Sequence, residues 1–147
     1  MRPKRELAEL LAEVALFSKC TAAQRRAIAR HAQIAELPAG TDLIKEGEPG
    51  DALFIILEGE AVVQSGGIEL DRVGEGAYFG EMAILDGAPR SATVVAVTDV
   101  KVAVIGIRMF RTMLREFSDL AEQLLIALAG ELREARKVQE TAPGTAR

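Results

Sequence analysis

The spacing of apolar residues predicts two helices at the start of the chain. In residues 6–17 the apolar side chains recur every three or four positions between glutamates, which is the period of an amphipathic helix. A second helix is predicted through about residue 32, because Thr21 and Gln24 have the spacing of a capping box. The apolar positions of the first helix are Leu7, Leu10, Leu11, Val14 and Phe17, and the arginines Arg25, Arg26 and Arg30 are expected on the solvent-exposed face of the second.

Residues 33–106 have a different pattern, in which short runs of β-branched residues alternate with Gly, Pro and Asp. Such runs predict strands, and Gly66-Gly67 between two of them predicts a tight hairpin. Seven or eight short strands at this spacing favour a jelly-roll sandwich or barrel. The strands are expected at residues 34–37, 42–45, 52–58, 60–64, 68–73, 91–97 and 100–105.

The helical period returns after Gly106. A short helix is predicted first, and Ser118 is then expected to cap a long helix that reaches about residue 138. Leucines recur every four residues in that long helix, but the repeat contains Gly130 and is not a regular heptad, so it does not predict a coiled coil. The apolar residues of the two helices are Phe110, Met113 and Leu114, then Leu120, Leu124, Leu128 and Leu132.

Residues 79–94, which read FGEMAILDGAPRSATV, concentrate the residue types that an anion site needs. Residues 81–85 can form one helical turn, whose first N–H groups have no partner within the turn. Gly80 allows the backbone to approach a ligand, and Arg90 can hold two phosphate oxygens at once. Glu81 would repel a phosphate, so we expect it to face a neutral hydroxyl such as that of a ribose. The segment therefore predicts a nucleotide site.

This segment resembles the phosphate-binding cassette of cyclic nucleotide-binding domains, found in cyclic-nucleotide-gated channels, protein kinase A regulatory subunits and catabolite activator proteins. Residues 37–51 and 54–62 resemble the glycine-punctuated strands of the same family, and the similarity covers roughly residues 14–132. The resemblance implies a mainly β fold with flanking helices. It consists of an eight-stranded jelly roll between an N-terminal helical bundle and C-terminal hinge and lid helices.

The resemblance also implies one domain over residues 1–147 and a role for each cassette residue. Arg90 would bind the cyclic phosphate, and Glu81 would accept a hydrogen bond from the ribose 2′-hydroxyl. Ser91 could contact the phosphate or a guanine amino group, so it does not choose between cAMP and cGMP, although we favour cAMP. Gly80, Met82, Ala83 and Ala92 would act through their backbone. Within the domain, helices are expected at about 6–32 and 107–139, and the β roll at about 33–106 with the cassette at 79–94.

Composition excludes several other classes of protein. The chain has 147 residues, of which 49% are hydrophobic and 27% charged, and this balance is typical of one globular domain. A net charge of −4 does not favour binding to nucleic acid or to an anionic membrane surface. No apolar run is long enough to span a membrane. Because Cys20 is the single cysteine and no apolar signal segment follows Met1, we expect a cytoplasmic protein.

Catalytic and metal-binding residues are not indicated. His31 is the only histidine and has no Cys or acidic companion at metal-ligand spacing, while Cys20 has no histidine near it in the sequence. A jelly-roll enzyme of the cupin type, which needs several histidines around a metal, is therefore disfavoured. We expect no enzyme activity and no cofactor other than the cyclic nucleotide as a regulatory ligand.

The predicted function is that of a sensor which converts cyclic nucleotide binding into movement of the C-terminal helix. In this hypothesis the helix at 81–85 moves inward, and Ile84 and Leu85 release or recruit Phe110 and Leu114. The expected partner is an effector protein or effector domain, and a homodimer through the C-terminal helix is possible. The alternative is a dimeric transcription regulator of the catabolite-activator type, lacking or separated from its DNA-binding module, since only residues 139–147 follow the long helix.

Overall fold

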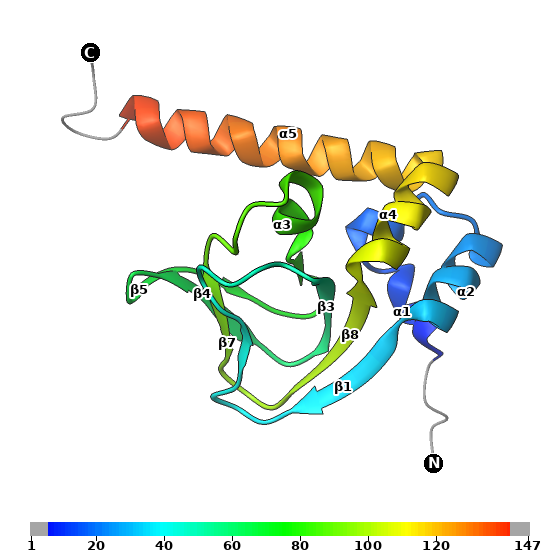
Figure 1. Cartoon of the computed structure of the whole chain (residues 1–147), viewed down its shortest axis with the longest axis horizontal. Helices are drawn as coiled ribbons and strands as arrows, with labels where there is room; N and C mark the ends of the chain where they lie inside the picture. Colours follow the sequence, from blue (N-terminus) through cyan, green and yellow to red (C-terminus); the bar gives the residue numbers. More distant parts are fainter. Residues whose placement is uncertain (1–5, 142–147) are drawn as a thin grey trace.

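Two four-stranded antiparallel sheets form one side of the protein, and the helices from both ends of the chain lie beside them (Figure 1). The computed structural model describes residues 6–141. The predicted fold, a mainly β jelly roll of eight strands with flanking helices, is confirmed. One sheet has the order β1 (Gln33–Leu37), β8 (Val100–Gly106), β3 (Ala52–Glu58) and β6 (Tyr78–Phe79), and the other has the order β2 (Asp42–Ile44), β7 (Thr93–Ala96), β4 (Ala61–Ser65) and β5 (Ile68–Val73).

Strand β3 explains how the core is divided. Its sequence Ala-Leu-Phe-Ile-Ile-Leu-Glu is apolar almost throughout, which is expected where both faces of a strand are buried. Leu53 and Ile55 lie in a cluster with the helices, whereas Ile56 lies in a second cluster between the two sheets. The helical cluster also contains Leu11, Phe17, Ile28, Ile84, Ile105, Phe110, Leu120 and Leu124, and the inter-sheet cluster contains Leu43, Ala61, Val94, Ala96, Val100 and Val102.

The seven predicted strands are observed, and their ends differ from the prediction by at most two residues. The hairpin at Gly66-Gly67 is confirmed, because Ser65 pairs with Ile68 and both glycines have positive φ angles of 58° and 80°. Strand β6 was missed, since two residues give no periodic signal. Phe79 in β6 pairs with Phe54 in β3, and their rings stack with centroids 5.5 Å apart.

The prediction of one continuous helix over residues 6–17 is wrong. Residues 6–17 form α1 (Leu7–Leu11) and a separate 3₁₀ turn, η1 (Ala15–Phe17), with Val14 in an extended conformation between them. The break allows the neighbouring side chains of Leu16 and Phe17 to be buried together, which one helical face would not permit.

Helix α2 (Ala22–His31) begins with the predicted capping box. The Thr21 hydroxyl accepts a hydrogen bond from the Gln24 N–H at 3.1 Å, and the Gln24 side chain accepts one from the Thr21 N–H at 2.8 Å. The arginine face was only partly predicted. Arg25 is half-buried and donates to the carbonyl oxygens of Phe17 and Cys20, so it joins α2 to the turn before it.

The C-terminal helices are α4 (Ile107–Glu116) and α5 (Ser118–Thr141). The prediction that Ser118 caps α5 is wrong by one residue, because Ser118 is already helical. Phe117 is the extended junction, and its carbonyl accepts hydrogen bonds from the N–H groups of Leu120 and Ala121. Phe117 packs against the helical cluster, and this burial fixes the position of the junction.

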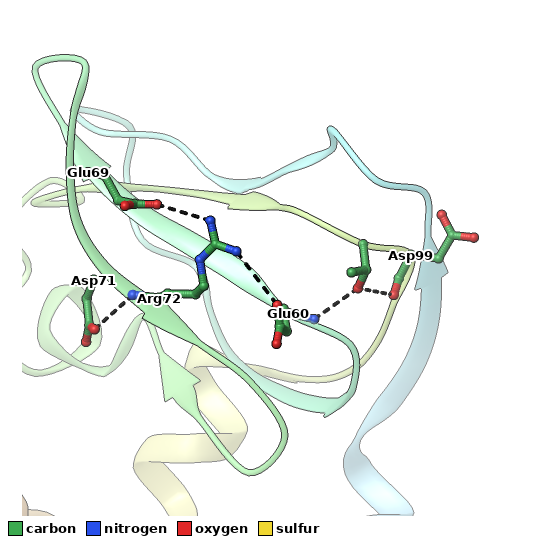
Figure 2. Close-up of polar contacts among 6 residues, drawn as sticks. Glu60, Glu69, Asp71, Arg72 and Asp99 are labelled. Atoms are coloured by element: carbon green, nitrogen blue, oxygen red, sulfur yellow. Dashed lines mark hydrogen bonds and ion pairs between the residues drawn. The ribbon is translucent and has the colours of Figure 1, made fainter.

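Strand β5 lies at an edge of its sheet and carries exposed ion pairs (Figure 2). Arg72 lies 3.5 Å from Glu69 and 3.9 Å from Glu60, and a shift in register between Val63 and Gln64 puts Glu69 and Arg72 on one face. Exposed pairs of this kind contribute little to stability. Charges and a bulge on an edge strand do, however, hinder pairing with the edge of another sheet.

Candidate functional site

Helix α3 (Glu81–Asp86) is the short helix predicted within the cassette, and Gly80 joins it to β6. Gly80 has a φ angle of 98°, in the left-handed region that side chains disfavour. A Cβ atom at this position would lie 2.5 Å from Nη1 of Arg90 and 2.7 Å from the carbonyl oxygen of Ala52. Glycine is therefore required both by the backbone conformation and by the close approach of Arg90.

The predicted site residues surround one cavity of about 190 Å³. It lies between α3, the loop that follows α3, and the strands β2, β4 and β7. One wall is apolar and is formed by Ile44, Val63, Phe79 and Val94. The structure thus brings together all the residues named from the sequence, which are Gly80, Glu81, Met82, Ala83, Arg90, Ser91 and Ala92.

Arg90 is a buried cation on this cavity, with 5% of its surface exposed. Its Nη1 donates to the Gly80 carbonyl at 3.1 Å, its Nη2 donates to the Ala52 carbonyl at 3.0 Å, and Nη2 lies 3.6 Å from a carboxylate oxygen of Asp51. Burial lowers the pKa of the guanidinium, while Asp51 and then Glu81 act to raise that pKa. An arginine remains charged under these conditions, so the site keeps a positive group held in one orientation.

The backbone of Arg90 is also held by two hydrogen bonds. Its N–H donates to the carbonyl of Glu48 at 2.8 Å, and its carbonyl accepts from the N–H of Gly47 at 2.9 Å. The loop before β3 therefore supports Arg90 through both main-chain and side-chain contacts, and little reorganisation is needed for the guanidinium to meet an anion.

Glu81 is the second buried charged residue, with 7% of its surface exposed. Its Oε2 atom has no hydrogen-bond partner, which is unusual for a buried carboxylate oxygen. Burial raises the pKa of Glu81; a backbone hydrogen bond lowers that pKa, Glu131 raises it, and Arg90 lowers it. The cavity therefore contains a buried acceptor that a ligand hydroxyl can satisfy.

The other predicted residues differ in exposure. Ala83 is buried, Ala92 is half-buried, and Met82 and Ser91 are exposed. After α3, a carboxylate oxygen of Asp86 accepts a hydrogen bond from the Ala88 N–H at 2.8 Å, which orders the loop that leads to Arg90.

Sequence reasoning did not assign the loop before β3 to the site. Gly50 packs against Ala83 and Arg90 so closely that an added Cβ would collide with the Cβ of Ala83. Asp51 and Ala52 supply the carboxylate and the carbonyl that hold Nη2 of Arg90. The sequence Glu-Pro-Gly-Asp predicts a turn here, but no neighbouring residue indicates that the turn faces Arg90.

Helix α5 passes along α3 (Figure 1). Glu131 of α5 is near enough to affect the pKa of Glu81, in the site, and that of Tyr78, in the neighbouring strand β6. Glu131 raises the pKa of Glu81, as described above. The pKa of Tyr78 is raised to about 12, mainly by burial, then by Glu81 and then by Glu131. Helix α5 belongs to the C-terminal helices for which the resemblance implied a hinge and lid role.

Other kinds of site find little support among the described residues. In residues 6–141 no three His, Cys, Asp or Glu side chains gather in a way that could hold a metal ion. His31 is exposed at the end of α2, and Cys20 is buried with a pKa raised mainly by that burial. Over the same range, no helix has the length and apolar character needed to cross a membrane.

A family model described as "Cyclic nucleotide-binding domain" matches residues 34–117. The chain belongs to this family. The resemblance found in the cassette is thus confirmed across both sheets. Among curated relatives, a cAMP-dependent protein kinase regulatory subunit of Aspergillus niger is 41% identical over 112 residues, which are 75% of this chain and 27% of that protein. The chain spans about a quarter to a third of the length of the curated relatives it matches.

Solved structures of family members have the same fold. The catabolite activator protein of Thermus thermophilus has a TM-score of 0.76 and 30% identity, covering 83% of this chain and 60% of its own. The regulatory subunit of a cAMP-independent protein kinase A from Trypanosoma brucei, in a triple mutant bound to cAMP, has a TM-score of 0.69 and 28% identity. That match covers 79% of this chain and 44% of the other.

Proposed function

We propose that the cavity beside α3 binds a 3′,5′-cyclic nucleotide, with cAMP favoured over cGMP, and that the protein is a regulatory sensor and not an enzyme. The observation that carries the proposal is the unpartnered Oε2 of buried Glu81 in the same cavity as buried Arg90. A ligand with an anionic group and a neutral hydroxyl would satisfy both residues. A cyclic nucleotide carries these two groups on one ribose ring.

Arg90 binds the cyclic phosphate in this proposal. A guanidinium has five N–H donors, and two hydrogen bonds to the Gly80 and Ala52 carbonyls leave others for phosphate oxygens. The backbone N–H groups of Met82, Ala83 and Ala92, with the hydroxyl of Ser91, complete the anion site.

The protein from Trypanosoma brucei supports this assignment. The mutations in its cAMP-bound form introduce an alanine, an arginine seven residues later and an alanine directly after the arginine. This chain has Ala83 and Arg90 at that spacing, followed by Ser91. Two of the three residue types introduced in that cAMP-bound mutant thus occur here at the same spacing. Ser91 is the departure, and its hydroxyl is the reason to compare cAMP with cGMP directly.

The test is a calorimetric titration with cAMP, cGMP and 2′-deoxy-cAMP. Wild type is expected to bind cAMP more tightly than cGMP, and to prefer the ribose to the 2′-deoxyribose because only the ribose hydroxyl can satisfy Glu81. Glu81→Ala should remove the preference for ribose while leaving the affinity for 2′-deoxy-cAMP nearly unchanged. An equal loss for both ligands would instead indicate misfolding, and no binding of either nucleotide by wild type would reject the proposal.

The output is proposed to be a movement of α4 and α5. Ile84 of α3 and Phe110 of α4 belong to the same buried cluster, so a shift of α3 on binding would disturb the packing of α4. Leu85 is 43% exposed, which leaves it free to change its contacts. Such coupling requires different ligand affinities for the two helix positions. Identical amide spectra of α5 with and without ligand would contradict it.

A second candidate output is a homodimer through α5, as in a transcription regulator of the catabolite-activator type. The observation in its favour is that Leu125, Ile126 and Leu132 of α5 are 68%, 57% and 54% exposed. Light scattering with and without cAMP tests for the dimer, and a gel-shift assay tests for DNA binding. If neither a dimer nor DNA binding is observed, an effector protein or domain remains the proposed partner. A cytoplasmic location stays a prediction.

A further inference from the structure

Arg111 connects α4 to the helix that carries the binding residues. Its Nη2 donates a hydrogen bond to the carbonyl oxygen of Ile84, at 2.7 Å, across 27 positions of sequence. Arg111 is an exposed residue of α4, yet this contact is partly buried. The arginine therefore reaches back over α3 instead of extending fully into solvent.

The position of this hydrogen bond on α3 matters because α3 has only six residues. The last carbonyl groups of a helix have no partner within it, and in a helix this short they are a large share of the backbone. Gly87 donates its N–H to the carbonyl of Ala83. Arg111 provides the partner for the next carbonyl, that of Ile84, and a cation at this end also suits the helix dipole.

The start of α4 is tied to the other side of the same site. The N–H of Ile107 donates to the carbonyl of Asp51 at 2.9 Å, and the side chain of Asp51 forms the ion pair with Arg90. Helix α4 thus contacts the loop that supports Arg90 through Ile107, and contacts α3 through Arg111. A rigid helix joined to both parts of a site can fix the distance between them.

We propose that Arg111 is a positioning residue, which holds α3 in the orientation that presents Glu81 to the cavity and transmits displacement of α3 to α4. The second part rests on the proposed function, because it assigns the displacement to binding of a cyclic nucleotide. Ile84 anchors α3 through its side chain in the core, and Arg111 anchors the same residue through its carbonyl. With both contacts in place, α3 cannot rotate about its axis without moving α4.

The first experiment needs no ligand. Amide hydrogen exchange is measured in the full chain for wild type, Arg111→Ala, Arg111→Lys and Arg115→Ala. Arg115 is the matched control, because it is an exposed arginine one turn further along α4 and no hydrogen bond joins it to α3 among the described residues. Loss of one hydrogen bond is expected to speed exchange at residues 85–87 by about three- to tenfold in Arg111→Ala.

Arg115→Ala is expected to exchange like wild type, and Arg111→Lys to fall between wild type and Arg111→Ala, since lysine keeps the charge but not the planar fork. Equal exchange in Arg111→Ala and wild type would overturn the positioning role. A lower unfolding midpoint with faster exchange throughout the chain would also overturn it, because the effect would then be global.

The second experiment adds cAMP and follows amide chemical shifts. In wild type, ligand is expected to shift both Ala92, across the cavity, and residues 107–116 of α4. In Arg111→Ala the shift at Ala92 should persist while the shifts in α4 shrink. The affinity for cAMP should fall about three- to tenfold, and more than the affinity for 2′-deoxy-cAMP, because Glu81 is no longer held toward the ribose hydroxyl. Full α4 shifts in Arg111→Ala would overturn the transmission role. If wild type binds no cyclic nucleotide, the proposed function fails, while the exchange measurement still decides the positioning role.

Discussion

Glu81 and Arg90 have opposite charges and line one cavity, but they do not form an ion pair with each other. Arg90 contacts Asp51 and two carbonyl oxygens, whereas Oε2 of Glu81 is left without a partner. A direct pair would use N–H donors of Arg90 and the free acceptor oxygen of Glu81. Their separation instead leaves one cation and one acceptor available to different parts of the same ligand.

Replacement of Arg90 tests the phosphate contact. Arg90→Leu should weaken cAMP binding by about 2–5 kcal/mol, or roughly 30- to several-thousandfold, because one partner of a buried charge pair is lost. The variant should also be less stable by about 1–3 kcal/mol, since the Gly80 and Ala52 carbonyls lose their donor. Calorimetry and urea unfolding measure the two effects. Wild-type affinity in a folded Arg90→Leu protein would reject the assignment.

Gly80 and Gly87 flank α3 and give a matched pair of alanine substitutions. Both have positive φ angles, of 98° and 71°. An added Cβ at Gly87 meets no atom within 4 Å, whereas at Gly80 it meets Arg90 and Ala52. Gly87→Ala should therefore cost about 1–2 kcal/mol of backbone strain, and Gly80→Ala about 2–4 kcal/mol with reduced cAMP affinity. Equal stability losses in urea unfolding would show that the close approach of Arg90 is unimportant.

The raised pKa of Glu81 predicts a dependence of stability on pH. Folding makes this carboxyl harder to ionise, so its contribution to stability is fully present below its ordinary pKa of 4.5 and is lost as pH rises through the raised pKa. We expect the free energy of unfolding of wild type, relative to Glu81→Gln, to decrease over that interval.

Urea unfolding at several values from about pH 4 to about pH 8 measures this difference. Every other titratable group is common to wild type and Glu81→Gln, so the contributions of those groups cancel in the difference. A difference for Glu81→Gln that is constant over the range would contradict the inferred burial of the charged carboxylate.

The capping box of α2 gives a prediction independent of any ligand. Thr21→Ala removes the acceptor for the Gln24 N–H and should lower stability by about 1 kcal/mol. Thr21→Ser keeps the hydroxyl and should cost much less. A stability loss in Thr21→Ser equal to that in Thr21→Ala would show that packing of the methyl group matters more than the cap.

Local sequence was sufficient for features that depend on neighbouring residues. The turn at Gly66-Gly67, the cap at Thr21 and the short helix after Gly80 were all predicted, because each is decided by residues within about four positions. The cassette is contiguous, so its residues could be named from the sequence. Residues 6–17 were predicted less well, because the break near Val14 follows from the burial of Leu16 against distant parts of the core.

The sequence by itself thus determined the family, most of the helices and strands in their order, and the cassette residues on one side of the cavity. Only the tertiary structure showed that Ala52 holds Arg90, that Glu81 lacks a partner, and that Arg111 reaches Ile84. These contacts join residues that are far apart in the chain, and they form only when strands such as β3 and β8 pair across the sheet. The apolar pattern selects which residues are buried, whereas the pairing of distant strands decides which buried polar atoms meet.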